Sequence, residues 1–381
     1  MTDIADIADK VQGVLDRSVA ELGVTGIIAH VQDESETWFG SAGVADLETG
    51  QRRGPADRFL IGSGGKAFTS ATILQLAAEG NLSLDDPVER WLPGVSRNGN
   101  DGSKITVRQL INHTSGLWVT GFDADLVRSF HTRAGFAQNR HRVWTVDELL
   151  DFALSQPPIF EPGTNFAYTN GAYHLAGAVI EKATGNAYED EVERTVIKPL
   201  GLSGTYARPL AEAGIRAPYT KTYSRMFIRD DVDPGSLTQE NWESTLQGPE
   251  TDAVDVTDST SFGWSAGNVV STTPDLLRFT GAMISGSLLA PAWHREMWTT
   301  NPTRNWIPHT RYGTGVSEWE LADGTTQRAV VGMSNGAATI TMGTPDGRRM
   351  VSMNVNCDWG WLPAFSAIME AVFGSPFLRQ Q

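Results

Sequence analysis

Strand-like runs occur at the two ends of this 381-residue chain, and the middle of the chain shows little strand alternation. Near the N-terminus, residues 26–32 and 37–39 are rich in Ile, Val and aromatic side chains, and the polar residues between them predict a hairpin. Three more strand-like runs follow near the other end, at 327–331, 337–342 and 350–355. Because elements of one kind pack in common layers, this order predicts an α+β fold whose sheet is built from both chain ends.

Helical patterns account for much of the remaining chain. Apolar residues at helical spacing predict an amphipathic helix at the N-terminus and further helices at 66–79, 274–284 and 364–373. Residues 85–215 alternate short helical patterns with turn clusters, whereas 218–262 form a long polar stretch of weak periodicity. A loop of that length inside a compact domain is usually functional or mobile.

These patterns predict one folded unit over residues 1–381. We expect an α/β portion formed by 1–84 and 262–381, and a mostly helical portion with substrate loops formed by 85–261. The cleft between the two portions is where we expect the functional site.

Charge and composition exclude several classes of function. The formal net charge of -15 repels phosphate backbones, and no basic stripe opposes it, so nucleic-acid binding is not expected. No stretch of about 18 uncharged apolar residues is present, and the acidic N-terminus lacks a basic leader pattern, so we expect a cytoplasmic protein that does not enter a membrane. Cys357 is the only cysteine and the histidines lack ligand spacing, so no metal and no other cofactor is expected.

Ser63 and Lys66 are the first candidates for chemistry. They lie three residues apart where a loop enters a predicted helix, so both side chains are on one helical face. A serine hydroxyl becomes a strong nucleophile when a neighbour takes its proton, and a buried lysine can do this because burial lowers its pKa. The alternative is a solvated helix start with Ser63 as its N-cap.

Several longer segments around these residues resemble one known superfamily. The run Phe59-Leu-Ile-Gly-Ser63-Gly-Gly-Lys66-Ala-Phe-Thr-Ser is similar to the nucleophile segment of serine β-lactamases of the AmpC type, of DD-peptidases and of related esterases and transacylases. Further similarity follows at residues 105–117 and at 161–170, which contain Tyr168-Thr-Asn170. The resemblance covers roughly residues 25–375, and it implies a β-lactamase/transpeptidase-like fold with an antiparallel sheet flanked by helices.

The resemblance also implies roles for individual residues. Ser63 would be the nucleophile, Lys66 its base and Tyr168 a second proton carrier, while Asn170 would bind a substrate amide or carbonyl and help to hold Lys66. The alternative for Tyr168 is a core aromatic residue with a satisfied hydroxyl, and for Asn170 a turn residue that caps the next helix.

The third family segment departs from the usual pattern. The best placement sets Val330 where the family normally has Lys or His, with Gly332 allowing close substrate approach. The Met333 N–H would then join that of Ser63 in an oxyanion hole. Because an apolar side chain cannot pair with an anion, Val330 argues against an efficient β-lactamase or carboxypeptidase and favours the esterase, amidase and acyltransferase branches.

Aromatic and histidine residues near these segments are weaker candidates. Trp118, Trp264 and Trp361 flank the family's site, and we expect Trp264 in particular to contact substrate, with core packing as the alternative for all three. His113 is expected to be a structural, hydrogen-bonding histidine rather than a base.

Together these residues predict a serine acyl-enzyme hydrolase or transacylase that acts on an ester or amide of a small molecule. An amine or alcohol could accept the acyl group in place of water, because both reactions use the same catalytic groups. A D-amino acid peptidase or weak β-lactamase is one alternative. A receptor that is acylated once without turnover is another, and Val330 is the feature that favours it.

Overall fold

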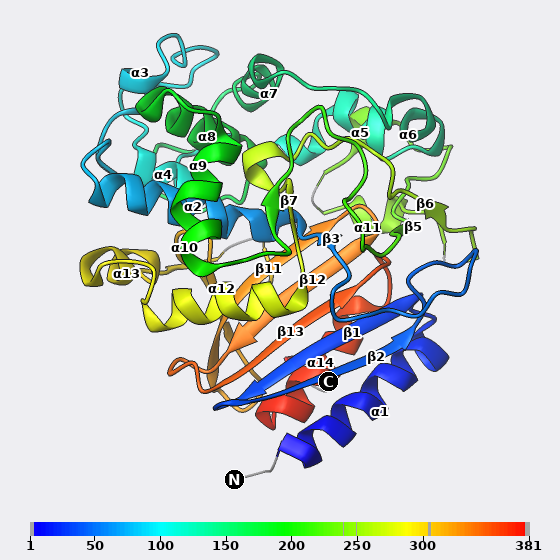
Figure 1. Ribbon diagram of the computed structural model, residues 1–381. Coiled ribbons are helices and arrows are strands. Elements are labelled where there is room, and N and C mark those ends of the chain that lie inside the picture. Colours follow the sequence, from blue (N-terminus) through cyan, green and yellow to red (C-terminus); the bar gives the residue numbers. More distant parts are fainter. Residues whose placement is uncertain (1–3, 239, 249, 304–305, 378–381) are drawn as a thin grey trace.

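A computed structural model describes residues 4–238, 240–248, 250–303 and 306–377. Its largest element is a twisted antiparallel sheet that lies below a mostly helical region in Figure 1. Across the sheet the strands follow the order β2 (Glu36–Gly43), β1 (Gly26–Asp33), β13 (Arg349–Val355), β12 (Ala337–Gly343), β11 (Thr326–Ser334), β10 (Ser317–Glu320), β9 (Thr310–Tyr312) and β8 (Asn301–Pro302).

Strands from the two ends of the chain are neighbours in this sheet. Ile27 of β1 pairs with Val355 of β13 in antiparallel register, so the predicted sheet built from both chain ends is confirmed. The sequence did not reveal the short strands β8 to β10. It also missed the small sheets β3–β7–β4 (Phe59–Leu60, Val269–Ser271, Tyr206–Ala207) and β5–β6 (Tyr223–Ser224, Val254–Asp255). Runs of two to four residues are too short to show the alternation of apolar and polar residues that predicts a strand.

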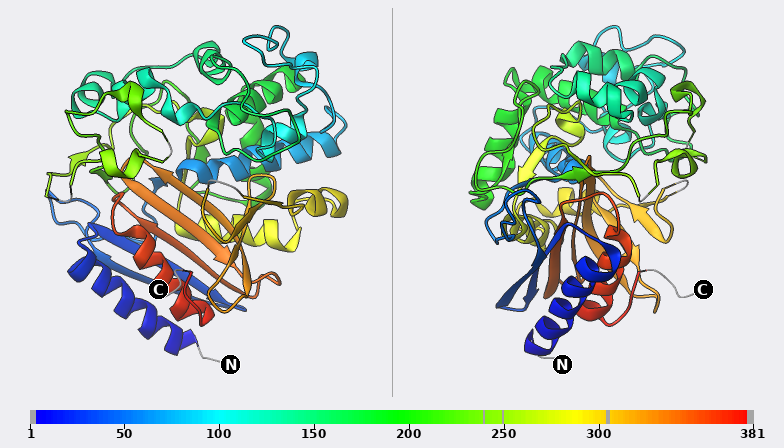
Figure 2. Two further views of the ribbon diagram at one scale, coloured as in Figure 1. Left: turned by 180° about the vertical axis from the view of Figure 1, so that it is seen from behind. Right: turned by 90° about the vertical axis from the view of Figure 1, so that its right-hand side faces the viewer.

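Two helices from opposite chain ends cover the outer face of the large sheet. They are α1 (Ile4–Leu22) and α14 (Trp361–Phe373), which lie side by side in both views of Figure 2. The buried side chains of α1 include Ile7, Val11 and Leu15, at the spacing of one helical face, so the predicted amphipathic helix packs on the sheet.

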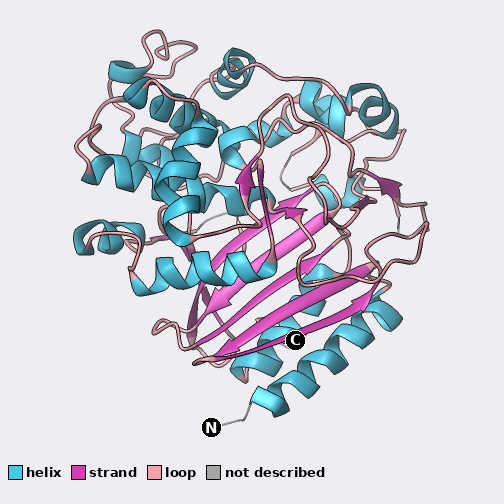
Figure 3. Cartoon of the chain, viewed as in Figure 1, coloured by secondary structure: helices cyan, strands magenta, loops and turns pink. Residues whose placement is uncertain are grey.

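The inner face of the sheet carries α12 (Thr273–Ser285) and, beyond it, α2 (Gly65–Ala78). Helix α2 is buried almost all round, since it lies between the sheet and the helical region. Figure 3 shows that region as short helices joined by long loops. Its helices are α3 (Val88–Trp91), α4 (Val107–Ile111), α5 (Ala124–Phe130), α6 (Arg133–Asn139), α7 (Val146–Ala153), α8 (Asn170–Thr184), α9 (Tyr188–Val192) and α10 (Lys198–Leu200).

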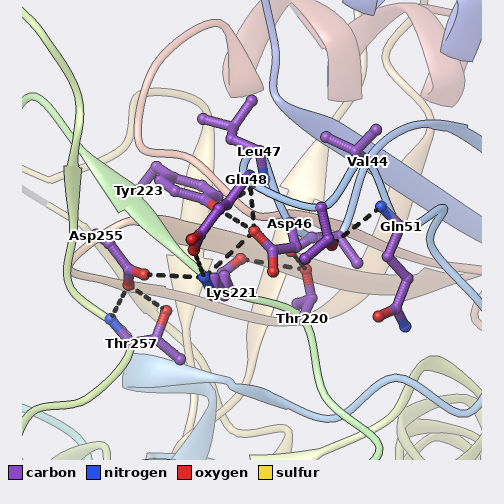
Figure 4. A network of polar contacts seen from close by, with 12 residues as sticks. Val44, Asp46, Leu47, Glu48, Gln51, Thr220, Lys221, Tyr223, Asp255 and Thr257 are labelled. Carbon is purple, nitrogen blue, oxygen red and sulfur yellow. Dashed lines mark hydrogen bonds and ion pairs between the residues drawn. The ribbon is translucent and has the colours of Figure 1, made fainter.

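The long polar segment at 218–262 contains only short elements, as its weak periodicity predicts. Lys221 links the segment to the α/β portion through two ion pairs, since its Nζ lies 3.2 Å from Asp46 Oδ1 and 3.3 Å from Glu48 Oε2 (Figure 4). The hydroxyl of Tyr223 accepts a hydrogen bond from the Leu47 N–H at 2.8 Å. These contacts hold one end of the segment beside the sheet. Within the described ranges, no helix is both long and apolar enough to cross a membrane.

Candidate active site

Ser63 lies in a 3-10 turn, Gly62–Gly64, that leads directly into α2. The turn follows β3, which pairs with β7 of the small sheet. A short strand, a tight turn and a buried helix therefore fix the position of the Ser63 backbone, as the predicted loop-to-helix entry requires.

Glycines hold the Ser63 turn against β11. A Cβ atom on Gly332 would overlap the Ile61 carbonyl oxygen and lie 2.8 Å from the Ser63 nitrogen. Gly62 has φ +52°, and a Cβ there would overlap the Met333 carbonyl. Only glycine permits backbones to approach this closely.

Lys66 lies one turn along α2, and its side chain is completely buried. Its Nζ lies 3.2 Å from Ser63 Oγ, 2.7 Å from Asn170 Oδ1 and 2.7 Å from the carbonyl oxygen of Ala266. Burial lowers the pKa of Lys66 to about 7. In the neutral amine, the two carbonyl oxygens take the two N–H groups, so the lone pair is directed at the Ser63 hydroxyl.

Tyr168 and Asn170 come from the N-terminal end of α8, where Thr169 is the N-cap and accepts from the Gly171 N–H at 3.3 Å. The Tyr168 hydroxyl lies close to the Ser63 side chain, and Lys66 Nζ is 5.0 Å from the centre of the Tyr168 ring. Burial raises the pKa of Tyr168 above its usual value, so Tyr168 is a neutral phenol near pH 7. The predicted cluster of Ser63, Lys66, Tyr168 and Asn170 is thus assembled in the structure.

Aromatic rings fix Tyr168 on two sides. The His113 ring lies 4.3 Å from it between centroids, and the Trp306 ring stacks on it at 5.3 Å. His113 Nδ1 accepts a long hydrogen bond of 3.4 Å from the Thr169 N–H. Burial lowers the pKa of His113 well below its usual value. His113 is therefore neutral and supports the α8 N-terminus, which agrees with a structural role.

Strand β11 contributes backbone and apolar groups beside the nucleophile. Val330 is 3% exposed and belongs to the same apolar core as α2, while Val331 and Met333 pack with the outer core. Since side chains alternate along a strand, Gly332 faces the Ser63 turn as Val330 does. At position 330, therefore, β11 presents an apolar side chain to the site and no positive charge.

A pocket of about 140 Å³ opens beside Ser63. The segment 218–262 supplies several lining residues, and Met333 and Asn170 line it as well. Its aromatic walls come from Phe130, Phe136 and Phe262.

The structure does not place Trp264 in this pocket, although the sequence predicted a substrate contact there. Trp264 is 2% exposed, donates from Nε1 to Glu189 Oε1 at 3.2 Å and packs edge-on against Tyr188. The residues beside it in sequence, Gly263 and Ala266, line the pocket instead. A 3-10 turn at Trp264–Ala266 sends the indole into the core, and neighbouring position alone could not show this.

The other two tryptophans also lie away from the pocket. Trp118 donates from Nε1 to the Phe152 carbonyl at 2.8 Å, and Trp361 begins α14 on the outer face of the sheet. Sequence reasoning missed two groups that the structure brings to the site, the Ala266 carbonyl and the Arg208 guanidinium. A backbone carbonyl has no sequence signal, and Arg208 is far from every motif in the chain.

The antiparallel sheet with helices on both faces, and a serine, lysine and tyrosine at its junction with a helical region, define the β-lactamase/transpeptidase-like fold. The chain belongs to the β-lactamase family, whose family model, described as "Beta-lactamase", matches residues 11–360.

Two curated relatives match part of the chain. Esterase EstB of Burkholderia gladioli is 34% identical over 206 residues, which are 52% of this chain and 51% of the relative. Penicillin-binding protein 4* of Bacillus subtilis is 30% identical over 240 residues, 61% of this chain and 46% of the relative. The chain thus spans about half the length of these relatives.

Solved structures match almost the whole chain. A D-stereospecific amidohydrolase from Streptomyces sp. has a TM-score of 0.83 and 34% identity, covering 96% of this chain and 98% of its own. D-amino acid amidase from Ochrobactrum anthropi SV3 has a TM-score of 0.78 over 97% of this chain and 99% of its own, and at 23% identity it is a likeness of fold.

Proposed function

We propose that this protein is a serine acyl-enzyme hydrolase acting on an ester or amide of a small molecule, with Ser63 as nucleophile, Lys66 as base and Tyr168 as proton carrier. One observation carries the proposal: a completely buried amine with a pKa of about 7 lies 3.2 Å from the serine hydroxyl. A base whose pKa is near the working pH is what general base catalysis requires.

In the first half of the reaction, Ser63 Oγ attacks the substrate carbonyl and its proton passes to Lys66. The backbone N–H groups of Ser63 and Met333 would stabilise the oxyanion. Tyr168 gives its proton to the leaving alcohol or amine as the bond to the acyl carbon breaks, and Lys66 returns a proton to Tyr168. The product of this half is an ester between Ser63 and the acyl group.

In the second half, a water molecule attacks the acyl ester while its proton passes to the Tyr168 and Lys66 pair. The bond to Ser63 Oγ then breaks and Ser63 recovers a proton, which restores the resting state. An amine or alcohol in place of water would give acyl transfer by the same steps, so we propose transacylation as the second outcome of the same chemistry.

The relatives support the ester and amide class, since one is named an esterase and another a D-stereospecific amidohydrolase. A β-lactamase or a D-amino acid peptidase is less favoured, because Val330 offers no charge to a substrate carboxylate. A receptor acylated without turnover would use the same base for the first half of the reaction and would lack the second half, so turnover distinguishes it from a hydrolase.

The test is turnover of p-nitrophenyl acetate by the wild type and by Ser63→Ala, with and without added primary amines. We expect nitrophenolate release to fall about 10³-fold or more in Ser63→Ala, as for loss of other serine nucleophiles. Acetate alone as product would establish hydrolysis, and acetamide products would establish transfer. Activity that survives in Ser63→Ala, or a single stoichiometric burst without turnover, would contradict the proposal.

A further inference from the structure

A buried arginine lines the pocket beside Ser63 without taking part in the chemistry proposed above. Arg208 follows β4 directly and is 3% exposed. Its Nε donates to Asn268 Oδ1 at 3.0 Å, and its Nη1 donates to the carbonyl oxygens of Gly214 at 2.8 Å and Ser259 at 3.1 Å. All three acceptors are neutral, and they fix the plane of the guanidinium.

No carboxylate in the part of the chain that the structure describes lies within ion-pair distance of this cation. Glu212 acts on it only at longer range and is itself paired with Arg216. Arg208 forms no ion pair with any described carboxylate, although arginines elsewhere, such as Arg194 and Arg349, do. Its Nη2 makes no hydrogen bond to a described residue. Buried charges in proteins are normally paired, because an unpaired charge loses its hydration without gaining a counter-charge.

The pocket that Arg208 lines has a composition suited to an anion. Among the described residues around it, Arg208 is the one charged side chain, and no Asp or Glu is present. Among the neutral polar side chains of the lining, the Ser261 hydroxyl and the Asn335 amide donate to no described residue, so they can donate hydrogen bonds to a bound carboxylate. The hydroxyl protons of Thr257, Ser259 and Thr260 are already donated within the protein.

The position of the pocket identifies the part of the substrate that enters it. Ser63 and Asn170 line the pocket, and Tyr168 does not. The leaving group departs beside Tyr168, which protonates it, so the acyl part extends to the other side of Ser63. The pocket volume, about 140 Å³, is well below the roughly 300–1,000 Å³ of sites for drug-sized ligands, so this acyl part is short.

We propose that Arg208 binds an anionic group, a carboxylate, on the acyl part of the substrate, so that the substrates are esters or amides of short acids that carry a second acidic group. This inference rests on the proposed function of the same site. A substrate with a free ammonium group on the acyl part would meet a cation here and would be disfavoured.

Binding to the Ser63→Ala protein tests the inference without any turnover. Calorimetric titration with monomethyl glutarate, which carries one carboxylate, is compared with dimethyl glutarate, which carries none. We expect the anion to bind about 10- to 100-fold more tightly, the range for a hydrogen bond to a charged group. Adding Arg208→Met to Ser63→Ala should abolish this preference, while Ser63→Ala with Arg194→Met should keep it, because Arg194 is paired with Glu79 and Glu191 away from the pocket.

A second variant separates binding from folding, since Arg208 also joins the loops at Gly214 and Ser259. Arg208→Lys keeps the charge and gives up part of those bonds, so we expect it to retain a preference for the anion. Equal binding of both esters by Ser63→Ala, or equal loss of both ligands in Arg208→Met with an unchanged melting temperature, would overturn the inference. A preference for the anion in a protein that shows no esterase activity would instead contradict the proposed function, and it would still support the anion site.

Discussion

Lys66 is the residue whose surroundings most directly determine the chemistry. It forms no ion pair with any carboxylate in the described part of the chain, and both of its carbonyl partners are neutral. A carboxylate beside it would stabilise the ammonium and raise its pKa, whereas burial alone favours the neutral amine. The site therefore contains a base that is ready to accept a proton near neutral pH.

The pH dependence of activity follows from this state of Lys66. Only the neutral amine accepts the Ser63 proton, so kcat/KM for p-nitrophenyl acetate should rise about tenfold per pH unit below the pKa and level off above about pH 7. Initial rates from pH 5 to pH 9 measure the midpoint. Lys104→Met serves as a control that should leave the midpoint unchanged, because Lys104 is an exposed lysine paired with Asp101 away from the pocket. A midpoint near pH 10 would show that Lys66 remains charged in the resting protein.

At the residue scale, the sequence predicted the site residues that belong to recognisable short motifs. Ser63, Lys66, Tyr168 and Asn170 lie in short motifs, and the structure brings them together as expected. The sequence could not reveal Arg208, since its place in the pocket depends on where β4 ends relative to the segment 218–262. The structure places Trp264 in the core rather than in the pocket, because proximity in sequence does not determine which way a side chain points.

At the scale of elements, the close backbone contact between the Ser63 turn and β11 is what fixes the position of the nucleophile relative to the strand. The turn and the strand are far apart in sequence, and they approach at two glycines, Gly62 and Gly332. This close approach places the strand backbone beside the nucleophile. The oxyanion geometry proposed for Met333 depends on it.

Gly332→Ala should therefore damage the site more than a single methyl group normally would. The added Cβ would overlap the Ile61 carbonyl, a backbone atom that cannot rotate away, so we expect a loss of about 1–3 kcal/mol in the free energy of unfolding. We also expect kcat/KM to fall by about 100-fold, as for loss of an oxyanion donor. Urea denaturation and ester kinetics measure both effects.

Gly54→Ala is the matched control, because the nearest atom to its added Cβ is a side-chain oxygen 3.7 Å away. It should leave both quantities almost unchanged. If Gly332→Ala behaved like Gly54→Ala, the close packing of β11 on the Ser63 turn would not be the constraint described here.

Elements with several residues on one periodic face could be predicted from the sequence, and shorter ones could not. The predicted helix at 66–79 corresponds to α2, and the strand-like run at 337–342 corresponds to β12. Strands β3, β4 and β7 have two or three residues each, and they exist because the Ser63 turn and its neighbours bring them together. Tertiary contacts determine such elements, so a local pattern does not encode them.

At the scale of the whole molecule, the two portions share one apolar core. Phe279 of α12 and Val330 of β11 belong to the same buried cluster as Leu110 of α4 and Leu149 of α7. The proposed division into 1–84 with 262–381 and 85–261 thus describes two layers that a common core joins. Separating the layers would divide this shared cluster, whereas the outer core between the sheet and helices α1 and α14 lies wholly within the first layer.

We therefore propose that the chain unfolds as one cooperative unit. Urea unfolding followed by far-ultraviolet circular dichroism and by tryptophan fluorescence should give coincident transitions, because both probes would report the same event. Two separated midpoints would show that the layers fold independently and would contradict the shared core as the basis of stability.

The central claim is that an acyl group becomes attached to Ser63, and intact mass spectrometry of the acid-quenched protein tests it most directly. After brief mixing with p-nitrophenyl acetate, the wild type should carry the mass of one acetyl group, and fragmentation should locate it on Ser63. Ser63→Ala should carry none. An acetyl group on another residue, or steady turnover with no covalent adduct in a protein that needs Ser63, would contradict the account.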